Sequence, residues 1–174
     1  MFDKISSLGI ISQSMIERNI NGIRIFGHDG DEGVIKEVFD EDVYRIGEIP
    51  IGSVVLDLGA HIGCFTLRCL VERECYVESY EPNPLSHAFL EYNLSGCLDS
   101  DNARSYIYRL AVCRQEQNAT VTTFACHLKH SASSRNYIDV KWKDRGEFIV
   151  VPTNAISLEE ILDQTTPEVI KIDI

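Results

Sequence analysis

The sequence lacks a long apolar run, an excess of basic residues and any basic stripe. No apolar stretch approaches the roughly 20 residues that a membrane-spanning helix needs, and residues 1–9 carry Asp3 and Lys4 where a secretory signal would be apolar. Lys and Arg number 16 against 27 Asp and Glu, a formal net charge of −11, which argues against a nucleic-acid-binding surface. We therefore expect a cytoplasmic protein that binds neither membranes nor nucleic acid.

The sequence also lacks a Cys-x-x-Cys pair. Its six cysteines lie apart, several of them inside apolar runs, at Cys64, Cys69, Cys75, Cys97, Cys113 and Cys126. This distribution predicts buried free thiols in a reducing compartment. Cys126, His127 and His130 lie close together, but no fourth group is obvious nearby, so a polar loop is favoured over a zinc site and we expect no metal.

Short apolar runs alternate with helical patterns in the middle of the chain. Strands are predicted over 53–58, 75–80 and 105–112, and helices over 63–72 and 84–94. This alternation predicts an α/β protein with a Rossmann-like, doubly wound and mostly parallel sheet that has helices on both faces. We expect residues 53–174 to form one domain, since 174 residues suit a single core.

The first 52 residues are predicted to be a lead-in that packs on this core. Helical periodicity is present over 5–20 and over 34–43, and 22–26 is typical of a short strand. Glu37 and Tyr44 of this lead-in are candidates to close over a bound cofactor.

The last third of the chain interrupts the alternation. Residues 120–125 and 148–151 are predicted to be strands of a small antiparallel insertion, and Ser157 is a good N-cap for a helix through Leu162. Residues 169–174 then form a fourth core strand. An open α/β sheet builds its active site at the carboxyl ends of its strands. We therefore expect the native protein to continue and this sheet to be incomplete; the alternative is a closing or edge strand of a small complete domain.

A glycine-rich loop follows the first predicted core strand and opens a helix. In Asp57-Leu58-Gly59-Ala60-His61-Ile62-Gly63, Gly59 allows a sharp turn and close approach of a ligand, and Gly63 allows close packing at a helix start whose amides favour an anion. Asp57 can accept hydrogen bonds from an amine or ordered water. A dinucleotide site would favour G-x-G-x-x-G without this acid, so a zwitterionic amino-acid tail fits better than a pyrophosphate.

A second acidic residue, Glu81, ends the next predicted strand about twenty residues further on. A carboxylate there can take both hydroxyls of an adenosyl ribose, although alone it could be a surface acid. The strand 169–174 places Lys171 and Asp173 on one face. Buried charges must be paired or functional, so Asp173 either positions an acceptor and draws a proton from it, or forms a structural pair with Lys171.

Six sequence blocks follow one another from Ser53 to the end: VVLDLGAHIGCFT, YEPNP, LAV, SASS, ISLEEIL and VIKIDI. In this order they resemble the FkbM family of methyltransferases. The resemblance implies a seven-stranded Rossmann-like sheet, S-adenosylmethionine as cofactor, and O-methylation of a hydroxyl on a sugar or small natural-product-like acceptor.

The resemblance also implies site residues. The expected cofactor residues lie in the first three blocks, at Asp57, Gly59, Ala60, Gly63, Glu81, Asn83 and Ala111. The catalytic candidates Lys171 and Asp173 fall in the family's K-x-D-x-E-G block, which this chain leaves before its Glu-Gly. N-methylation, a non-catalytic adenosyl-binding module and an NAD-binding oxidoreductase remain alternatives, and the sequence does not indicate an oligomeric state.

Overall fold

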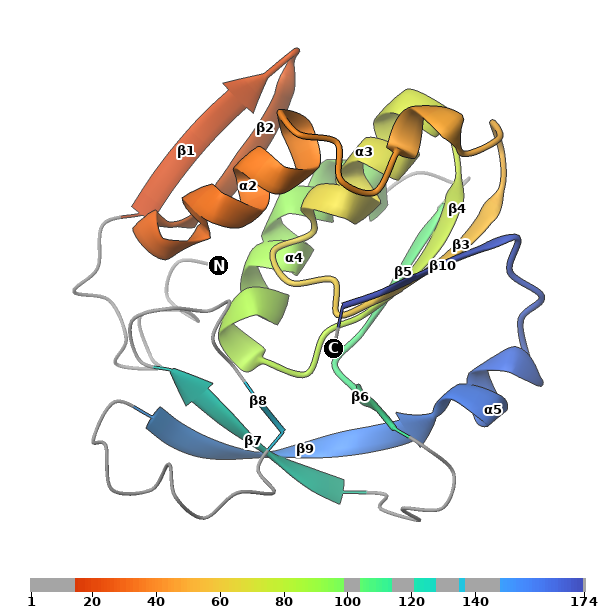
Figure 1. The fold of residues 1–174 in the computed structure, drawn as a ribbon. Helices are drawn as coiled ribbons and strands as arrows, with labels where there is room; N and C mark the ends of the chain where they lie inside the picture. Colours follow the sequence, from red (N-terminus) through yellow and green to blue (C-terminus); the bar gives the residue numbers. More distant parts are fainter. Residues whose placement is uncertain (1–14, 99–103, 114–120, 128–134, 137–147, 174) are drawn as a thin grey trace.

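A four-stranded parallel sheet organises the protein (Figure 1). The computed structural model describes residues 15–98, 104–113, 121–127, 135–136 and 148–173. The sheet has the order β10-β3-β4-β5 and is built from β3 (Val54–Leu58), β4 (Tyr76–Tyr80), β5 (Ser105–Tyr108) and β10 (Val169–Ile172). The order of these strands is that of one half of a doubly wound sheet, which confirms the predicted fold class.

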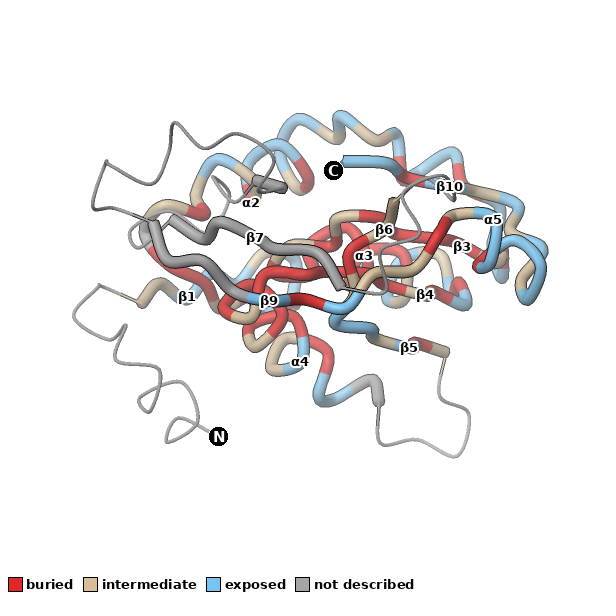
Figure 2. Tube along the Cα trace, turned by 90° about the horizontal axis from the view of Figure 1, so that it is seen from below, coloured by how far each residue is buried: buried red, intermediate tan, exposed pale blue. Residues whose placement is uncertain are grey.

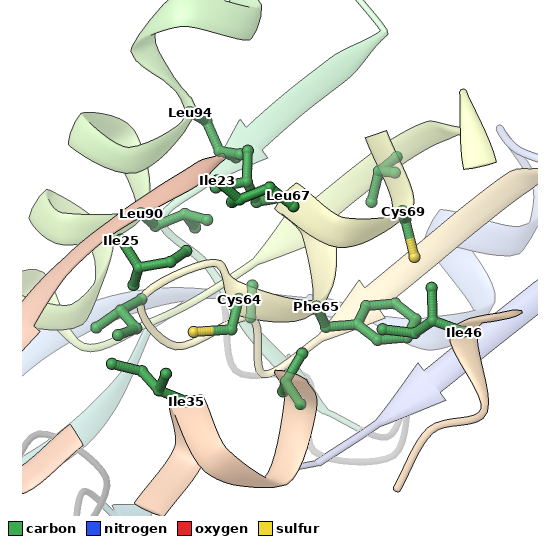
Figure 3. Packing of buried hydrophobic residues seen from close by; sticks show 14 of the residues in the cluster. Ile23, Ile25, Ile35, Ile46, Cys64, Phe65, Leu67, Cys69, Leu90 and Leu94 are labelled. Carbon is green, nitrogen blue, oxygen red and sulfur yellow. The ribbon is translucent and has the colours of Figure 1, made fainter. Parts of the chain in front are cut away.

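Helices cover both faces of this sheet. On one face α3 (Cys64–Arg73) and α4 (Pro84–Leu98) bury a large apolar cluster, in which Phe65 lies beside Ile46 and Leu90 beside Ile25 (Figure 3). On the opposite face α5 (Leu158–Leu162) forms a smaller cluster with β3 and β4. The predicted helices over 63–72 and 84–94 are therefore confirmed, with α4 extending four residues further.

The lead-in differs from its prediction. Residues 15–20, expected to be helical, form the strand β1 (Met15–Ile20), which pairs antiparallel with β2 (Ile23–His28). Asn21 and Gly22 join them with φ values of 53° and 87°. Two positive φ values at Asn-Gly define the tight hairpin turn whose twist matches paired strands, so this dipeptide overrides the helical spacing before it.

The rest of the lead-in also reaches the core. The short 3₁₀ helices η1 (Asp29–Asp31) and η2 (Ile46–Glu48) flank α2 (Glu32–Phe39), which begins and ends earlier than the predicted 34–43. Ile35 and Val38 of α2 join the large apolar cluster.

A second sheet contains the predicted insertion. Its order is β6-β9-β7-β8, with β7 (Val121–His127) antiparallel to β9 (Phe148–Ser157) and β8 (Arg135–Asn136) beside β7. The predicted single strand over 105–112 is wrong, because the chain leaves the main sheet after β5 and continues as β6 (Ala111–Cys113). Ala111 pairs with Ala155 of β9, which makes β6 a strand of the second sheet. Because this pairing joins residues 44 positions apart, the local sequence pattern does not predict it.

Strand β10 lies at the edge of the main sheet among the described strands, not at its centre. In Figure 2, β3 is coloured mainly as buried, whereas exposed residues gather along β10. Ser157 caps α5 as predicted, since its hydroxyl accepts a hydrogen bond from the Glu160 amide at 3.1 Å.

The structure also bears on the predicted state of the cysteines and on the length of the helices. Cys64, Cys69 and Cys75 are buried free thiols, as predicted, whereas Cys113 is a free thiol that is only half-buried. The side chains of Cys97 and Cys126 lie outside the described set. None of the helices in the described part of the chain combines the length and apolarity that crossing a bilayer requires.

Candidate functional site

The glycine loop between β3 and α3 has the strained backbone that its sequence predicts. Gly59, His61 and Gly63 have φ values of 81°, 54° and 90°. These values lie in the left-handed region, which residues other than glycine rarely adopt. A Cβ at Gly63 would lie 2.7 Å from Leu90 Cδ1, so glycine is required for close packing of α3 on α4. Gly63 provides no side-chain cap for α3, which leaves the first-turn amides of this helix available to a ligand.

Glu81 ties the loop after β4 to the glycine loop. Its Oε2 accepts the amide hydrogen of His61 at 2.8 Å, and its Oε1 accepts that of Asn83 at 2.8 Å. A carboxylate offers about four acceptor positions, so each oxygen can accept one further hydrogen bond. Burial raises the pKa of Glu81 to about 7, against the opposing effects of the two amides and of Lys171.

Asp57 lies fully buried at the end of β3, in contact with two side chains. Its Oδ2 accepts a hydrogen bond from the Thr66 hydroxyl at 2.6 Å, and its Oδ1 forms an ion pair with Lys171 Nζ at 3.0 Å. Lys171 Nζ also donates to the Gly59 carbonyl at 2.6 Å. Asp57 was predicted to accept hydrogen bonds from an amine or from ordered water, and in this structure the Lys171 ammonium is the amine that it contacts.

Asp173 follows β10 and lies beside the end of β3, where its amide donates to the Leu58 carbonyl at 2.9 Å. Its carboxylate is 65% exposed and 4.0 Å from Lys171 Nζ, so the tight partner of Lys171 is Asp57, and the expected structural pair is only a distant contact. The Tyr44 hydroxyl donates to Asp173 Oδ2 at 2.9 Å. Burial, followed by this hydrogen bond, raises the pKa of Tyr44, which keeps the hydroxyl a donor.

The lead-in contributes a buried acid that sequence reasoning missed. Asp31 is 0% exposed, accepts the amide hydrogen of His28 at 2.8 Å, and lies 3.5 Å from His61 Nε2 of the glycine loop. Burial is the main cause that lowers the pKa of His61, so this imidazole is neutral near pH 7. The pairing of Asp31 with a histidine 30 residues later depends on tertiary packing, which local sequence pattern does not encode.

Asn93 of α4 holds the lead-in against the same loop. Its side-chain amide donates to the carbonyls of Phe26 at 2.9 Å and Ile62 at 2.8 Å, and its oxygen accepts the Phe26 amide at 2.8 Å. One side chain therefore connects β2, α4 and the glycine loop, which makes the lead-in part of the framework of the site. Tyr44 of the lead-in reaches the site through Asp173, as described above.

The remaining predicted cofactor residues, Ala60, Asn83 and Ala111, are all buried. Ala60 is buried, and its amide donates to the Tyr80 carbonyl at 3.1 Å. Asn83 is buried and caps α4, because its Oδ1 accepts the Leu85 amide at 2.9 Å. Ala111 is buried at the start of β6. The described residues contain no group of three or more His, Cys, Asp or Glu side chains that could hold a metal ion. The side chains of Cys126, His127 and His130 lie outside the described residues, so the choice between a polar loop and a zinc site there stays a prediction.

Comparison with known proteins gives distant likeness only. Neither protein-family models nor curated proteins match the chain. Among solved structures, P. horikoshii TYW2 in complex with MeSAdo aligns with a TM-score of 0.46 and 22% identity over 57% of this chain and 37% of that chain.

Two further structures are similar at lower scores. A transferase structure from Pyrococcus horikoshii has a TM-score of 0.43 and 21% identity over 57% of this chain and 37% of that chain. A SAM-dependent methyltransferase from Agrobacterium tumefaciens has a TM-score of 0.43 and 13% identity over 56% of this chain and 33% of that chain. This chain therefore spans about a third of the length of each of these proteins.

Proposed function

We propose that the protein binds S-adenosylmethionine between the glycine loop and Glu81 and serves as the cofactor-binding core of a methyltransferase. One observation carries the proposal: a buried carboxylate at the end of β4 is oriented by an amide of the glycine loop and retains one acceptor position on each oxygen. This geometry suits the two neighbouring hydroxyls of an adenosyl ribose. The uncapped start of α3 suits the carboxylate of the cofactor's amino-acid tail.

When bound, S-adenosylmethionine supplies an activated methyl group on a sulfonium centre. The residues of this chain then have to align an acceptor and receive its proton. Asp173 is the exposed carboxylate beside the glycine loop, and Tyr44 orients it. In this proposal Asp173 takes the proton of an acceptor hydroxyl, whereas Lys171, buried against Asp57, is a positioning residue that holds the Gly59 carbonyl.

The preferred acceptor is a hydroxyl on a sugar or another small molecule. Support comes from the exposed carboxylate at the expected acceptor side, because a hydroxyl is a weak nucleophile that needs such a base. An amine acceptor would need less help from Asp173, so the activity of an Asp173→Asn variant distinguishes O- from N-methylation. The net charge of −11 favours a neutral or small acceptor over a polyanion.

Calorimetric titration with S-adenosylmethionine tests the cofactor assignment. Glu81→Gln removes the charge while keeping the shape, and we expect about ten- to hundredfold weaker binding at pH 8, from the loss of charged hydrogen bonds. Glu91→Gln is the matched control, because Glu91 is a half-exposed acid of α4, and it should bind like the parent.

NAD serves as the competing ligand in the same experiment. Absence of S-adenosylmethionine binding by the folded parent protein would overturn the proposal. Binding of NAD with equal or higher affinity would favour the oxidoreductase alternative. Binding of S-adenosylmethionine without transfer to any acceptor by the full-length protein would favour a non-catalytic module.

A further inference from the structure

A cavity lies on the face of the sheet opposite the large apolar cluster. It has a volume of about 320 Å³, within the usual range of small-ligand sites. Strands β4 and β5 form one side of it, and α5 with the end of β9 forms the other. Residues that point to the same sheet face line it, among them Glu78, Tyr80, Tyr106 and Tyr108, joined by Gln164 and Thr165.

The wall formed by β4 and β5 carries three tyrosines, whereas the facing wall contributes the aliphatic side chains of Ile156 and Ile161. Tyr80 and Tyr108 stack with ring centroids 4.9 Å apart and an interplanar angle of 22°. Tyr106 is 56% exposed although it lines the cavity, so one aromatic side chain stands at an open rim. Aromatic faces carry negative partial charge and attract cations.

An acidic group lies among these rings. Glu78 Oε2 accepts a hydrogen bond from the Tyr80 hydroxyl at 3.1 Å, and Oε1 accepts one from the Thr165 hydroxyl at 2.7 Å. Both contacts orient the carboxylate without neutralising its charge. In the described part of the chain, Glu78 forms no ion pair with a basic side chain. Among the described residues, this oriented carboxylate beside the tyrosines therefore has no basic side chain paired with it.

We propose that this cavity binds a small organic cation of the quaternary or alkylated ammonium type. Cation–π contact with the tyrosines and charge attraction to Glu78 act on the same ligand. A neutral ligand of equal size would retain only the apolar contact. The site is separate from the cofactor site, since its lining residues point away from Asp57 and Lys171 on the other sheet face, and its test requires no S-adenosylmethionine.

Choline and its neutral isostere 3,3-dimethylbutan-1-ol are the probes, titrated into the protein by calorimetry or by NMR of the tyrosine rings. We expect saturable choline binding that is about tenfold or more tighter than binding of the isostere. Glu78→Gln should weaken choline binding about tenfold and leave the isostere unchanged. Tyr106→Ala should weaken choline binding about fivefold, and the exposure of Tyr106 makes this variant compatible with folding.

Tyr76→Ala is the matched control. Tyr76 is 51% exposed at the start of β4 and does not line the cavity, so its removal should leave choline binding unchanged. Equal affinity for choline and the isostere would overturn the assignment to a cation. No saturation by choline with the folded parent protein, or equal losses in Tyr76→Ala and Tyr106→Ala, would overturn the site itself.

Discussion

The two faces of the parallel sheet differ in how completely they are covered. The face that packs against α3 and α4 buries polar groups entirely, with Asp57 and Ser79 both 0% exposed. The opposite face is covered in its middle by Ile161, while its rims remain open, with Ile172 59% and Tyr106 56% exposed.

This difference decides what each face can do. Polar groups on the covered face have to satisfy one another, and they form a connected set in which Thr66 links Asp57 to Ser79 and Lys171 neutralises Asp57. The open face can keep an acid and aromatic rings accessible to a ligand. Four predictions test the comparison, ordered from the largest expected effect to the smallest.

Breaking the buried ion pair should have the largest effect. Lys171→Met leaves Asp57 charged and buried without a cation, which costs about 3–5 kcal/mol of unfolding free energy. Lys36→Met is the control, because Lys36 pairs with Glu41 while 64% exposed, and such pairs contribute about 1 kcal/mol or less. Urea denaturation measures both values. Similar losses in the two variants would contradict the view that burial sets the strength of these pairs.

A methyl group at the start of α3 should have the next largest effect. Gly63→Ala places a Cβ 2.7 Å from Leu90 Cδ1 at a φ of 90°, for which we expect a loss of about 2–4 kcal/mol. Gly33→Ala in α2 has no atom within 4 Å of its new Cβ and no positive φ, so it should gain about 0.5 kcal/mol. Thermal unfolding of the pair should therefore shift in opposite directions, and a shift in the same direction would refute the packing argument.

The buried Glu81 should make stability depend on pH. Burial raises its pKa from 4.5 to about 7, so the folded protein holds this proton more tightly than the unfolded chain does. The stabilisation is complete below pH 4.5 and is lost as pH rises to about 7, by roughly 3 kcal/mol. Glu81→Gln should remove this slope in denaturation measured from pH 4.5 to 7.5.

The same titration should act on ligand binding in the opposite direction. The ionised form of Glu81 is the one that accepts two hydroxyl hydrogens, so affinity for S-adenosylmethionine should increase as pH rises through about 7. If the stability and the affinity of the parent protein are both independent of pH in this range, the pKa of Glu81 is not raised to about 7, and the prediction is wrong.

The smallest effect is expected at the open rim. Ile172→Thr changes a side chain that is 59% exposed and should alter stability by about 0.5 kcal/mol or less. Ile161→Ala removes the 2% exposed side chain that covers the middle of the same face, with an expected loss of about 2–5 kcal/mol. Urea denaturation of both variants gives their free energies of unfolding and so locates the boundary between the covered and the open parts of this face. A large loss of unfolding free energy in Ile172→Thr would mean that the covered part extends to β10.

Local signals in the sequence were sufficient for much of the core and for part of the site. Gly59 and Gly63 predicted the positive φ angles, because few other residues adopt them, and Ser157 predicted a helix start as its N-cap. The place of Glu81 at a strand end followed from apolar periodicity. In the lead-in, Asn21-Gly22 was a usable hairpin signal that helical spacing had concealed.

Tertiary structure alone decided which of these groups meet. Lys171 pairs with Asp57 rather than with Asp173 because parallel registration sets Lys171 directly beside Asp57 on the neighbouring strand. Asp31 reaches His61 only when the hairpin packs on α4, and the tyrosine cavity forms only when α5 folds back over β4 and β5. Sequence period determines which face a side chain takes within its own element, whereas its partner depends on distant segments that no local pattern encodes.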